Sequence, residues 1–243
     1  MKTVLLLGAT SDIGQALAEK YAKEGYGLLL AGRNLTHLED ISADLNIRYN
    51  VAVRCYFFEA LDYGSHSSFY EELPGTPDVT ICIFGYLGEQ ERAETEWQEC
   101  ERIMDVNYKA AVSILNIVAN SYQKAGSGTI IGISSVAGDR GRQSNYFYGS
   151  AKAGFTAYLS GLRNRLFKSQ VHVLTVKPGF VNTKMTEGMP LPAPLTAEPQ
   201  KVASAIYSAA RKKKNVLYVL GVWRLIMTVI VLIPEFVFKR LKL

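Results

Sequence analysis

Cysteine is scarce in this sequence, and its few cysteines form no metal-binding or disulfide pattern. Cys55, Cys82 and Cys100 are widely spaced, with no Cys-x-x-Cys pair and no histidine at the spacing of zinc ligands. We therefore expect reduced, buried thiols, no metal site and a cytoplasmic protein. The first apolar run starts at Thr3, which leaves no room for a signal peptide before it.

The sequence also lacks the marks of a disordered or membrane-spanning chain. Its 243 residues are 48% hydrophobic and 20% charged and contain no low-complexity segment, which is typical of one globular domain. A late apolar run, Leu225–Ile233, is bounded by Arg224 and Pro234. It is shorter than the roughly 20 residues that a spanning helix needs, so we predict no helix that crosses a bilayer.

Acidic residues are almost absent from the end of the sequence. Residues 201–243 hold nine Lys or Arg and one acid, Glu235, whereas residues 1–200 hold 18 basic and 21 acidic residues. A basic body would favour nucleic acid, but an acidic body with a basic, apolar tail favours a membrane surface. We therefore expect the tail, residues 221–243, to lie on the inner face of the membrane. An oligomer interface is the alternative.

Strand and helix patterns alternate along the first 220 residues. Apolar runs predict strands at 4–7, 28–31, 51–57, 79–84, 130–133, 171–176 and 216–220. Helical patterns occupy 13–24, 35–45, 65–73, 94–124, about 148–167 and 199–212. This alternation predicts an α/β fold, a single domain over 1–220 with a Rossmann-type, doubly wound, seven-stranded parallel sheet.

A segment rich in proline and methionine, residues 184–198, interrupts this alternation. It follows a strand end near the expected site and has no regular pattern. We interpret it as an irregular lid over the substrate, with an ordinary surface loop as the alternative.

A strand, a tight turn and a helix open the chain in the order that a phosphate-binding site requires. The turn comprises Gly8, Thr10, Ser11, Asp12, Ile13 and Gly14. Backbone N–H groups at a helix N-terminus bind phosphate, and glycine lets the backbone approach it closely. Only Gly8 and Gly14 of a GxGxxG pattern are glycines, so a plain turn in which Asp12 caps the helix is the alternative.

A basic residue follows the second predicted strand. In dinucleotide sites an acidic residue here binds the adenine ribose, whereas a basic residue accepts a 2′-phosphate. This chain has Arg33 and Asn34, and no acid before Glu39. A guanidinium binds phosphate through charge-assisted hydrogen bonds, so the sequence favours NADP(H) over NAD(H). A solvated turn arginine is the alternative.

Three polar groups converge after the fifth predicted strand. Ser135 ends that strand, and Tyr148 and Lys152 stand four residues apart in a helical pattern, which places them on one face. A phenol is a weak acid at neutral pH, but a nearby ammonium favours the phenolate, and a serine can hold a carbonyl oxygen. This pattern predicts proton transfer to a carbonyl. A chance Tyr–Lys pair on an amphipathic helix is the alternative.

Taken together, these motifs resemble the short-chain dehydrogenase/reductase family over nearly the whole sequence. Gly8 to Gly14 match its TGxxxGxG turn, with Leu7 in place of Thr and Asp12 in place of the middle Gly. Ser135 corresponds to the family's serine, and Tyr148 and Lys152 correspond to its YxxxK motif. Asn107 corresponds to the family's helix asparagine. The PG pair and its downstream threonine correspond to Pro178, Gly179 and Thr183. A departure is Cys-Ile-Phe-Gly at 82–85, where most members carry NNAG.

The resemblance implies a role for each matching residue. Tyr148 donates the proton, and Lys152 holds the nicotinamide ribose and lowers the tyrosine pKa. Ser135 positions the carbonyl, and Asn107 supports a water that leads to Lys152. The implied cofactor contacts are Gly8, Thr10, Ser11, Asp12, Ile13, Gly14, Arg33, Asn34, Phe84, Gly85, Tyr148, Lys152, Pro178, Gly179, Val181 and Thr183.

Within the family, the segments GATSDIG, FGYLG and SSVAGDRGRQSNYFYGSAKAG and the tail are similar to decaprenylphosphoryl 2-keto-pentose reductases. This similarity implies NADPH-dependent reduction of a keto-sugar on a polyprenyl phosphate in polysaccharide biosynthesis, a flavoenzyme oxidase as partner, and a homo-oligomer. Two alternatives stay open: a reductase of a lipid ketone such as a 3-keto acyl or 3-keto sphingoid compound, and a non-catalytic nucleotide-binding protein. No nucleic-acid partner is expected.

Overall fold

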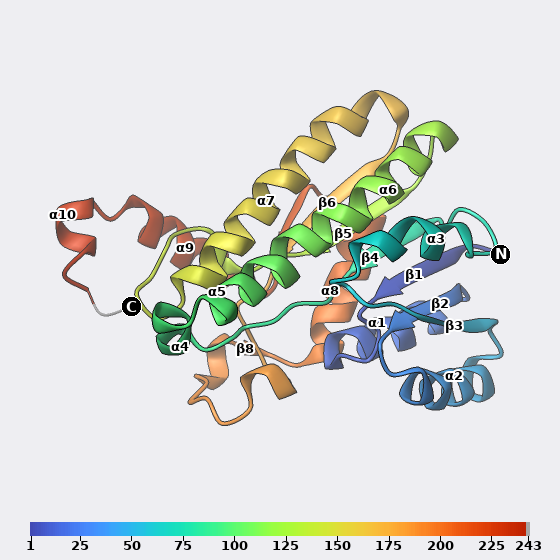
Figure 1. Ribbon diagram of the computed structural model, residues 1–243, viewed down its shortest axis with the longest axis horizontal. Coiled ribbons are helices and arrows are strands. Elements are labelled where there is room, and N and C mark those ends of the chain that lie inside the picture. Colours follow the sequence, from blue (N-terminus) through green and yellow to red (C-terminus); the bar gives the residue numbers. More distant parts are fainter. Residues whose placement is uncertain (242–243) are drawn as a thin grey trace.

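A seven-stranded parallel sheet forms the centre of the protein. The computed structural model describes residues 1–241, and Figure 1 shows the sheet between two layers of helices. The strands, in the spatial order β3-β2-β1-β4-β5-β6-β9, are β1 (Thr3–Leu7), β2 (Gly27–Gly32), β3 (Val53–Phe57), β4 (Val79–Cys82), β5 (Thr129–Ile133), β6 (His172–Lys177) and β9 (Val216–Tyr218). This order confirms the predicted doubly wound Rossmann-type sheet.

Helices cover both faces of the sheet, as the apolar character of the strands requires. On one face lie α1 (Asp12–Lys23), α2 (Leu35–Tyr49) and α8 (Pro199–Arg211). On the other lie α3 (His66–Glu71), α6 (Ala110–Ala125) and α7 (Tyr146–Leu166). Alternate residues of β1 serve the two cores: Val4 and Leu6 pack towards the first, and Leu5 and Leu7 towards the second.

The strands end in register along one edge. Leu7 pairs with Ala31 on one side and with Cys82 on the other, and Cys82 pairs in turn with Gly132. The loops that follow β1, β2, β4 and β5 therefore leave the sheet at the same level. Parallel sheets collect their ligands at this carboxyl edge.

The single long helix predicted for residues 94–124 is wrong. The structure has α4 (Gln90–Thr95), α5 (Trp97–Met104), a π-helical turn (Asp105–Lys109) and α6 instead. The first break falls at Glu96, whose backbone is extended. The π turn is centred on Asn107, whose Nδ2 donates to the Ile103 carbonyl at 2.8 Å and so occupies an acceptor that the regular helical ladder uses.

Strand ends and the lid also differ from the predictions. β4 stops at Cys82 rather than at residue 84, because the N–H groups of Ile83 and Phe84 both turn to the Leu7 carbonyl. The expectation that residues 184–198 lack regular structure is wrong. They contain two 3₁₀ turns and a short strand, β8 (Thr196–Ala197), which pairs with β7 (Phe180–Val181).

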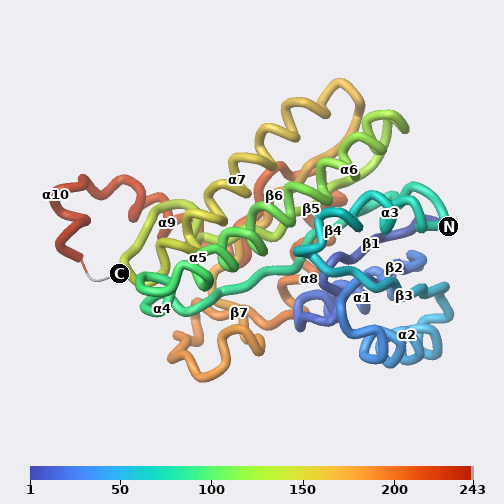
Figure 2. Tube along the Cα trace, in the orientation of Figure 1, coloured from blue at the N-terminus to red at the C-terminus, as the bar shows by residue number. Residues whose placement is uncertain are grey.

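The end of the chain packs against the body and then projects from it. It forms α9 (Val222–Leu232) and α10 (Glu235–Phe238), which lie at one end of the molecule in Figure 2. Trp223 and Met227 are buried against Val136, in the loop that follows β5. Within residues 1–241 no helix has the length and apolar character needed to cross a membrane.

Candidate active site

A continuous cleft runs along the carboxyl edge of the sheet. Its larger cavity, of 580 Å³, contains Ser135, Tyr148 and Lys152, and its smaller cavity, of 340 Å³, contains the turn after β1 and Arg33. The residues common to both are Ile13, Ile83, Gly85, Thr183 and Met185. We call the smaller cavity the nucleotide half and the larger one the substrate half.

Close backbone packing shapes the turn of the nucleotide half. Gly8 has a φ of +94°, and a Cβ on it would lie 2.8 Å from the backbone nitrogen of Phe84. A Cβ on Gly14 would lie 2.6 Å from the Gly8 carbonyl oxygen. Both positions therefore require glycine, because these contacts lie below any normal carbon contact distance. Gly14 lies behind the turn, and it lines neither half of the cleft within the described residues.

The helix cap of this turn is Ser11 rather than Asp12. Ser11 Oγ accepts a hydrogen bond from the Gly14 N–H at 3.1 Å and donates to the Gly8 carbonyl. Asp12 instead accepts a hydrogen bond from the Lys184 N–H at 2.8 Å, which ties the first turn of α1 to the start of the lid.

Arg33 and Asn34 occupy different positions. Arg33 is exposed at the mouth of the nucleotide half, with its Nη1 3.9 Å from Glu59 Oε2. Asn34 caps α2 by accepting a hydrogen bond from the His37 N–H at 3.0 Å, and within the described chain it lines neither half of the cleft. The Asn34 side chain is therefore occupied as a helix cap, and its contact with the cofactor stays a prediction.

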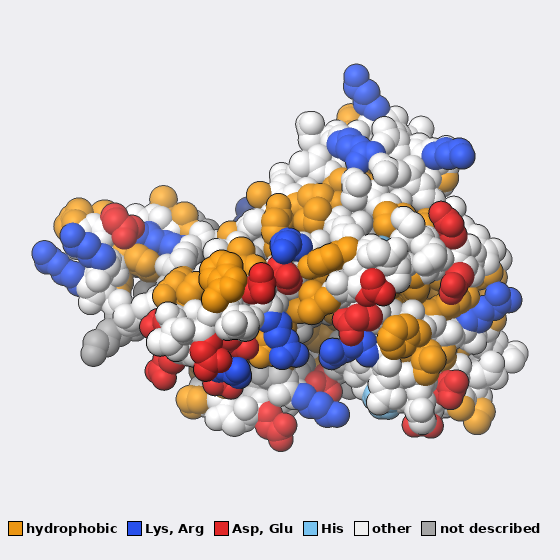
Figure 3. Space-filling model, in the orientation of Figure 1, with side chains coloured by type: hydrophobic (Ala, Val, Ile, Leu, Met, Phe, Trp, Pro, Cys, Tyr) orange, Lys and Arg blue, Asp and Glu red, His pale blue; other side chains and the backbone are white. Residues whose placement is uncertain are grey.

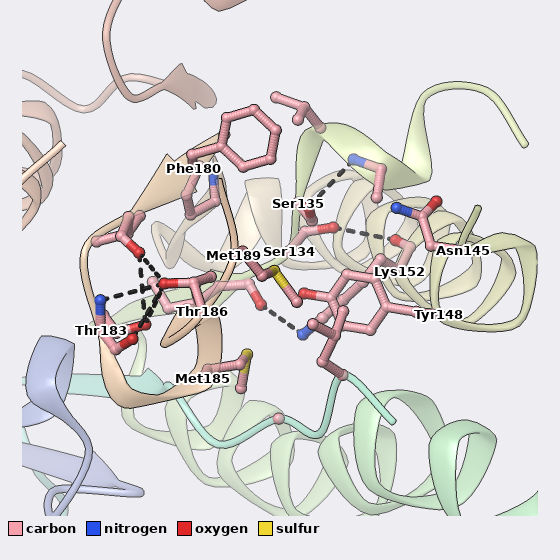
Figure 4. A pocket seen from close by; sticks show the side chains of 18 of the residues that line it. Ser134, Ser135, Asn145, Tyr148, Lys152, Phe180, Thr183, Met185, Thr186 and Met189 are labelled. Carbon is pink, nitrogen blue, oxygen red and sulfur yellow. Dashed lines mark hydrogen bonds between the residues drawn. The ribbon is translucent and has the colours of Figure 1, made fainter. Parts of the chain in front are cut away.

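The substrate half brings the three predicted catalytic side chains together (Figure 4). Ser135 follows β5, and Tyr148 and Lys152 lie on the first turns of α7. Lys152 Nζ lies 5.6 Å from the centre of the Tyr148 ring and donates to the Ile133 carbonyl at 3.1 Å. Lys152 is 3% exposed, so its ammonium is held in a fixed place between strand and helix.

The two serines at the end of β5, Ser134 and Ser135, make different contacts. Ser134 is buried, donates to the Lys152 carbonyl at 3.0 Å and contacts the Thr156 hydroxyl at 2.7 Å, so it fastens β5 to α7. Both serines line the cavity, and Ser135 Oγ accepts from the Ala137 N–H at 3.1 Å. Because Ser134 Oγ is already bonded to α7, Ser135 is the serine of this pair whose hydroxyl hydrogen is not used to join β5 to α7.

Burial controls the titration of the catalytic pair. It raises the pKa of Tyr148 to about 12, an effect that the Ser135 hydroxyl partly offsets. It lowers the pKa of Lys152 to about 8. The expected lowering of the Tyr148 pKa by Lys152 is therefore wrong for the protein alone, because loss of hydration dominates. At neutral pH the phenol carries its proton and Lys152 is charged.

Asn107 lies beside the catalytic lysine without lining the cavity. Its Nδ2 donates to the Tyr86 carbonyl, and its Oδ1 accepts from the Tyr86 N–H at 3.2 Å. A Cβ on Gly85 would lie 3.0 Å from Asn107 Oδ1 and 3.4 Å from Lys152 Nζ. The amide and the ammonium therefore flank the same glycine, and Asn107 is buried.

A buried carboxylate that the sequence analysis missed holds the loop after β4. Glu99, on α5, accepts hydrogen bonds from the Tyr86 hydroxyl at 2.8 Å and from the Glu89 N–H at 3.0 Å. The sequence gave no sign of this role, because it predicted a continuous helix through Glu99. The structure breaks that helix at Glu96, and the Glu99 side chain is buried.

The segment after β6 completes the cleft with help from the tail. Pro178, Gly179, Val181 and Thr183, which were predicted as cofactor contacts, all line the substrate half. Trp223 of α9 lies directly on Gly179: a Cβ on this glycine would be 2.0 Å from the indole nitrogen. The same nitrogen donates to the carbonyl of Leu195, in the lid, at 3.1 Å.

Several lining residues of the substrate half were not found from the sequence. They are Gln90, Arg142, Ser144, Asn145, Phe180 and Trp223. They come from α4, the loop before α7, β7 and α9, and no local motif marks them. Met185 and Met189, which also line this half, belong to residues 184–198, the segment predicted as a lid. Figure 4 shows Met185 and Met189 facing Tyr148 across the cavity.

Curated relatives cover nearly the whole chain. An uncharacterized oxidoreductase of Mycobacterium tuberculosis, Rv2073c, is 38% identical over 241 residues, which is 98% of this chain and 96% of that protein. An uncharacterized oxidoreductase from the mprA 5′ region of Streptomyces coelicolor is 34% identical over 244 residues, which is 99% of this chain and 96% of that protein.

Solved structures share the fold. A short-chain dehydrogenase from Sphingobium yanoikuyae in complex with NADPH has a TM-score of 0.82 at 24% identity, covering 94% of this chain and 93% of that chain. Levodione reductase has a TM-score of 0.82 at 20% identity, covering 92% and 98%. The family model of the short chain dehydrogenases matches residues 2–191. With the cleft just described and relatives along its whole length, this chain belongs to the short-chain dehydrogenase/reductase family of oxidoreductases.

Proposed function

We propose that this protein is an NADP(H)-dependent reductase that converts a ketone to an alcohol. The observation that carries the proposal is the meeting of three groups in one cavity: the Ser135 hydroxyl, the Tyr148 phenol and the buried Lys152 ammonium. The cavity continues into the nucleotide half, so a carbonyl at Ser135 and Tyr148 would lie beside the place where a dinucleotide ends.

The nucleotide half fits a dinucleotide phosphate. The close packing of Gly8 leaves backbone free to face a pyrophosphate at the first turn of α1. Arg33, exposed beside Glu59, provides the cation for a 2′-phosphate and would exchange its weak ion pair for a stronger one. The Sphingobium yanoikuyae relative is described as a complex with NADPH, which supports the same choice. The reduced nicotinamide supplies the hydride.

Side chains of the protein supply and transfer the proton that the reduction needs. Ser135 donates a hydrogen bond to the carbonyl oxygen, and Tyr148, protonated because its pKa is raised, transfers its proton to that oxygen. Lys152 stabilises the phenolate that remains. Asn107 and Lys152, on either side of Gly85, support the water through which Tyr148 is protonated again.

The lining of the substrate half suits a keto-sugar carried on a lipid. Gln90, Ser144 and Asn145 present polar groups to a hydroxylated ring, while Met185 and Met189 present adaptable apolar surface to a chain. We propose a keto-sugar on a polyprenyl phosphate, supplied by a flavoenzyme that oxidises the sugar. The apolar surface equally fits a 3-keto acyl or 3-keto sphingoid compound, which is the second candidate.

The tail suits the same substrate, because it combines apolar and basic surface (Figure 3). Leu225, Leu232 and Phe236 are 67%, 74% and 65% exposed, and Arg224, Lys239 and Arg240 lie among them. Such a surface binds at the headgroup level of an anionic bilayer. We propose peripheral attachment to the inner face of the membrane. A second copy of the chain on the same surface is the alternative.

Co-sedimentation with anionic vesicles tests this attachment. Leu232→Glu combined with Phe236→Glu should lower the bound fraction at least about tenfold, because two apolar side chains that would enter the bilayer are replaced by carboxylates. The matched control, Ile47→Glu, changes an apolar residue that is 83% exposed on α2 and should bind as the unaltered chain does. Equal binding by all three proteins, with a smaller particle size for the tail variant, would identify a subunit interface instead.

Tyr148→Phe tests the catalytic proposal. NADPH oxidation with a panel of lipid-linked keto-sugars, 3-keto lipids and small ketones should fall at least about 10³-fold, because the ring stays and only the proton is lost. NADPH affinity should change little. Tyr146→Phe, two residues earlier and 40% exposed, is the control and should retain activity. Equal rates for the unaltered chain and Tyr148→Phe across the panel would contradict the reductase function and favour a non-catalytic nucleotide-binding protein.

A further inference from the structure

Two arginines of one loop differ sharply in their partners. Arg140 donates to the carbonyls of Ile230 and Ile233 at 2.8 and 2.6 Å and pairs with Glu235 at 2.9 Å. Arg142, two residues later, lines the substrate half, and its Nε is buried with no hydrogen-bond partner in the described structure. None of the ion pairs within residues 1–241 includes Arg142.

The walls of the substrate half cannot neutralise this guanidinium. Within residues 1–241 no Asp or Glu lines the cavity, and the other lining cation is Lys152, which donates to the Ile133 carbonyl. Asp139 lies three residues before Arg142, but it is already paired with Lys177 and accepts a hydrogen bond from the Tyr218 hydroxyl at 2.8 Å. A half-buried charge without a partner is costly, so a ligand anion would relieve an existing penalty.

The position of Arg142 indicates where the anion belongs on the substrate. Arg142 stands in the loop between Ser135 and Tyr148, and Arg140 of the same loop contacts the tail. Trp223 of α9 lines the same cavity as Arg142. An anion bound by Arg142 would therefore share the cavity with the carbonyl site and with the base of the tail.

We propose that Arg142 is a substrate-binding residue that binds a phosphate ester on the ketone substrate. A guanidinium matches two phosphate oxygens with two parallel N–H groups. This inference rests on the proposed reductase function and narrows its substrate to a phosphate-bearing ketone. The same chemistry fits a phosphate on a lipid chain and a phosphate on a soluble sugar, which binding measurements can separate.

Calorimetric titration of the full-length chain with farnesyl phosphate and with farnesol tests the proposal. The unaltered protein should bind the phosphate at least about tenfold more tightly than the alcohol. Arg142→Gln should remove this preference, and Arg142→Lys should keep part of it because the charge remains. The control, Arg54→Gln, changes an exposed arginine on β3 and should leave the preference intact.

Each outcome has a defined meaning. Competition by glycerol 3-phosphate, weakened by Arg142→Gln, would identify a soluble phosphate as the source, and no competition would identify a lipid-borne one. Equal affinity for farnesyl phosphate and farnesol, or a preference that survives Arg142→Gln, overturns the assignment. Loss of NADPH affinity in Arg142→Gln with the preference intact would also overturn it. Because binding is measured without turnover, phosphate selectivity without reduction of any ketone would refute the reductase function alone.

Discussion

The two halves of the cleft are built in opposite ways. The turn in the nucleotide half is formed by one short stretch of the chain, where Gly8 and Gly14 bring β1 and α1 together. The substrate half is assembled from distant segments: Arg140 contacts carbonyls 90 to 93 residues away, and Trp223 donates to a residue 28 positions earlier. Local geometry thus fixes the part that binds a common cofactor, while long-range packing fixes the part that selects a substrate.

The largest effect that separates the halves should come from Trp223. Trp223→Ala removes the indole from Gly179 and its hydrogen bond to Leu195, so the lid loses its support. We expect kcat/KM for the ketone to fall about 10- to 100-fold, because small displacements of a substrate are costly in rate. NADPH affinity, measured by titration, should change less than about threefold.

Two further variants serve as controls for this experiment. Trp97→Ala alters a tryptophan that is 68% exposed on α5 and should behave as the unaltered chain does. Trp223→Phe keeps a ring over Gly179 but cannot donate to Leu195, so its loss in kcat/KM should be intermediate. A parallel loss of NADPH affinity in Trp223→Ala would show that the two halves are not independent.

A further effect should come from pH, through Lys152 in the substrate half. Burial lowers the pKa of Lys152 to about 8 and raises that of Tyr148 to about 12. Reduction needs both groups protonated, and only Lys152 loses its proton between these values. With NADPH binding first, kcat/KM for NADPH reports on the free enzyme. It should be level below about pH 7 and fall about tenfold per unit above about pH 8. A level profile up to about pH 10 would contradict the lowered pKa of Lys152.

The same contrast explains what the sequence could predict. The seven-stranded parallel sheet, the glycine turn and the Ser135–Tyr148–Lys152 set follow from short sequence patterns, so these features could be found before the structure. The π turn at Asn107 could not, since it depends on a side chain that competes for the Ile103 carbonyl. The only sequence signal for the π turn was a polar residue, Asn107, within an apolar helical pattern.

Fewer residues of the substrate half could be predicted from the sequence. Trp223 lies in a hydrophobic run that predicts a tail, and nothing in that run shows that its indole packs on Gly179. Arg142 sits in a polar loop, where an arginine is ordinarily solvated. The reversed direction of the Tyr148 pKa was missed for a related reason, because loss of hydration depends on how far the surrounding chain closes around the group.

The contacts between Arg140 and the end of α9 make the last helices of the protein part of the support for the site. All seven strands of the sheet precede residue 219, so the sheet is complete without α9. The loop that carries Arg140 takes its partners from residues 230–238. A chain truncated before Ile230 would therefore keep a complete sheet next to an unsupported Ser135–Tyr148 loop, so loss of the tail should damage the site more than the fold.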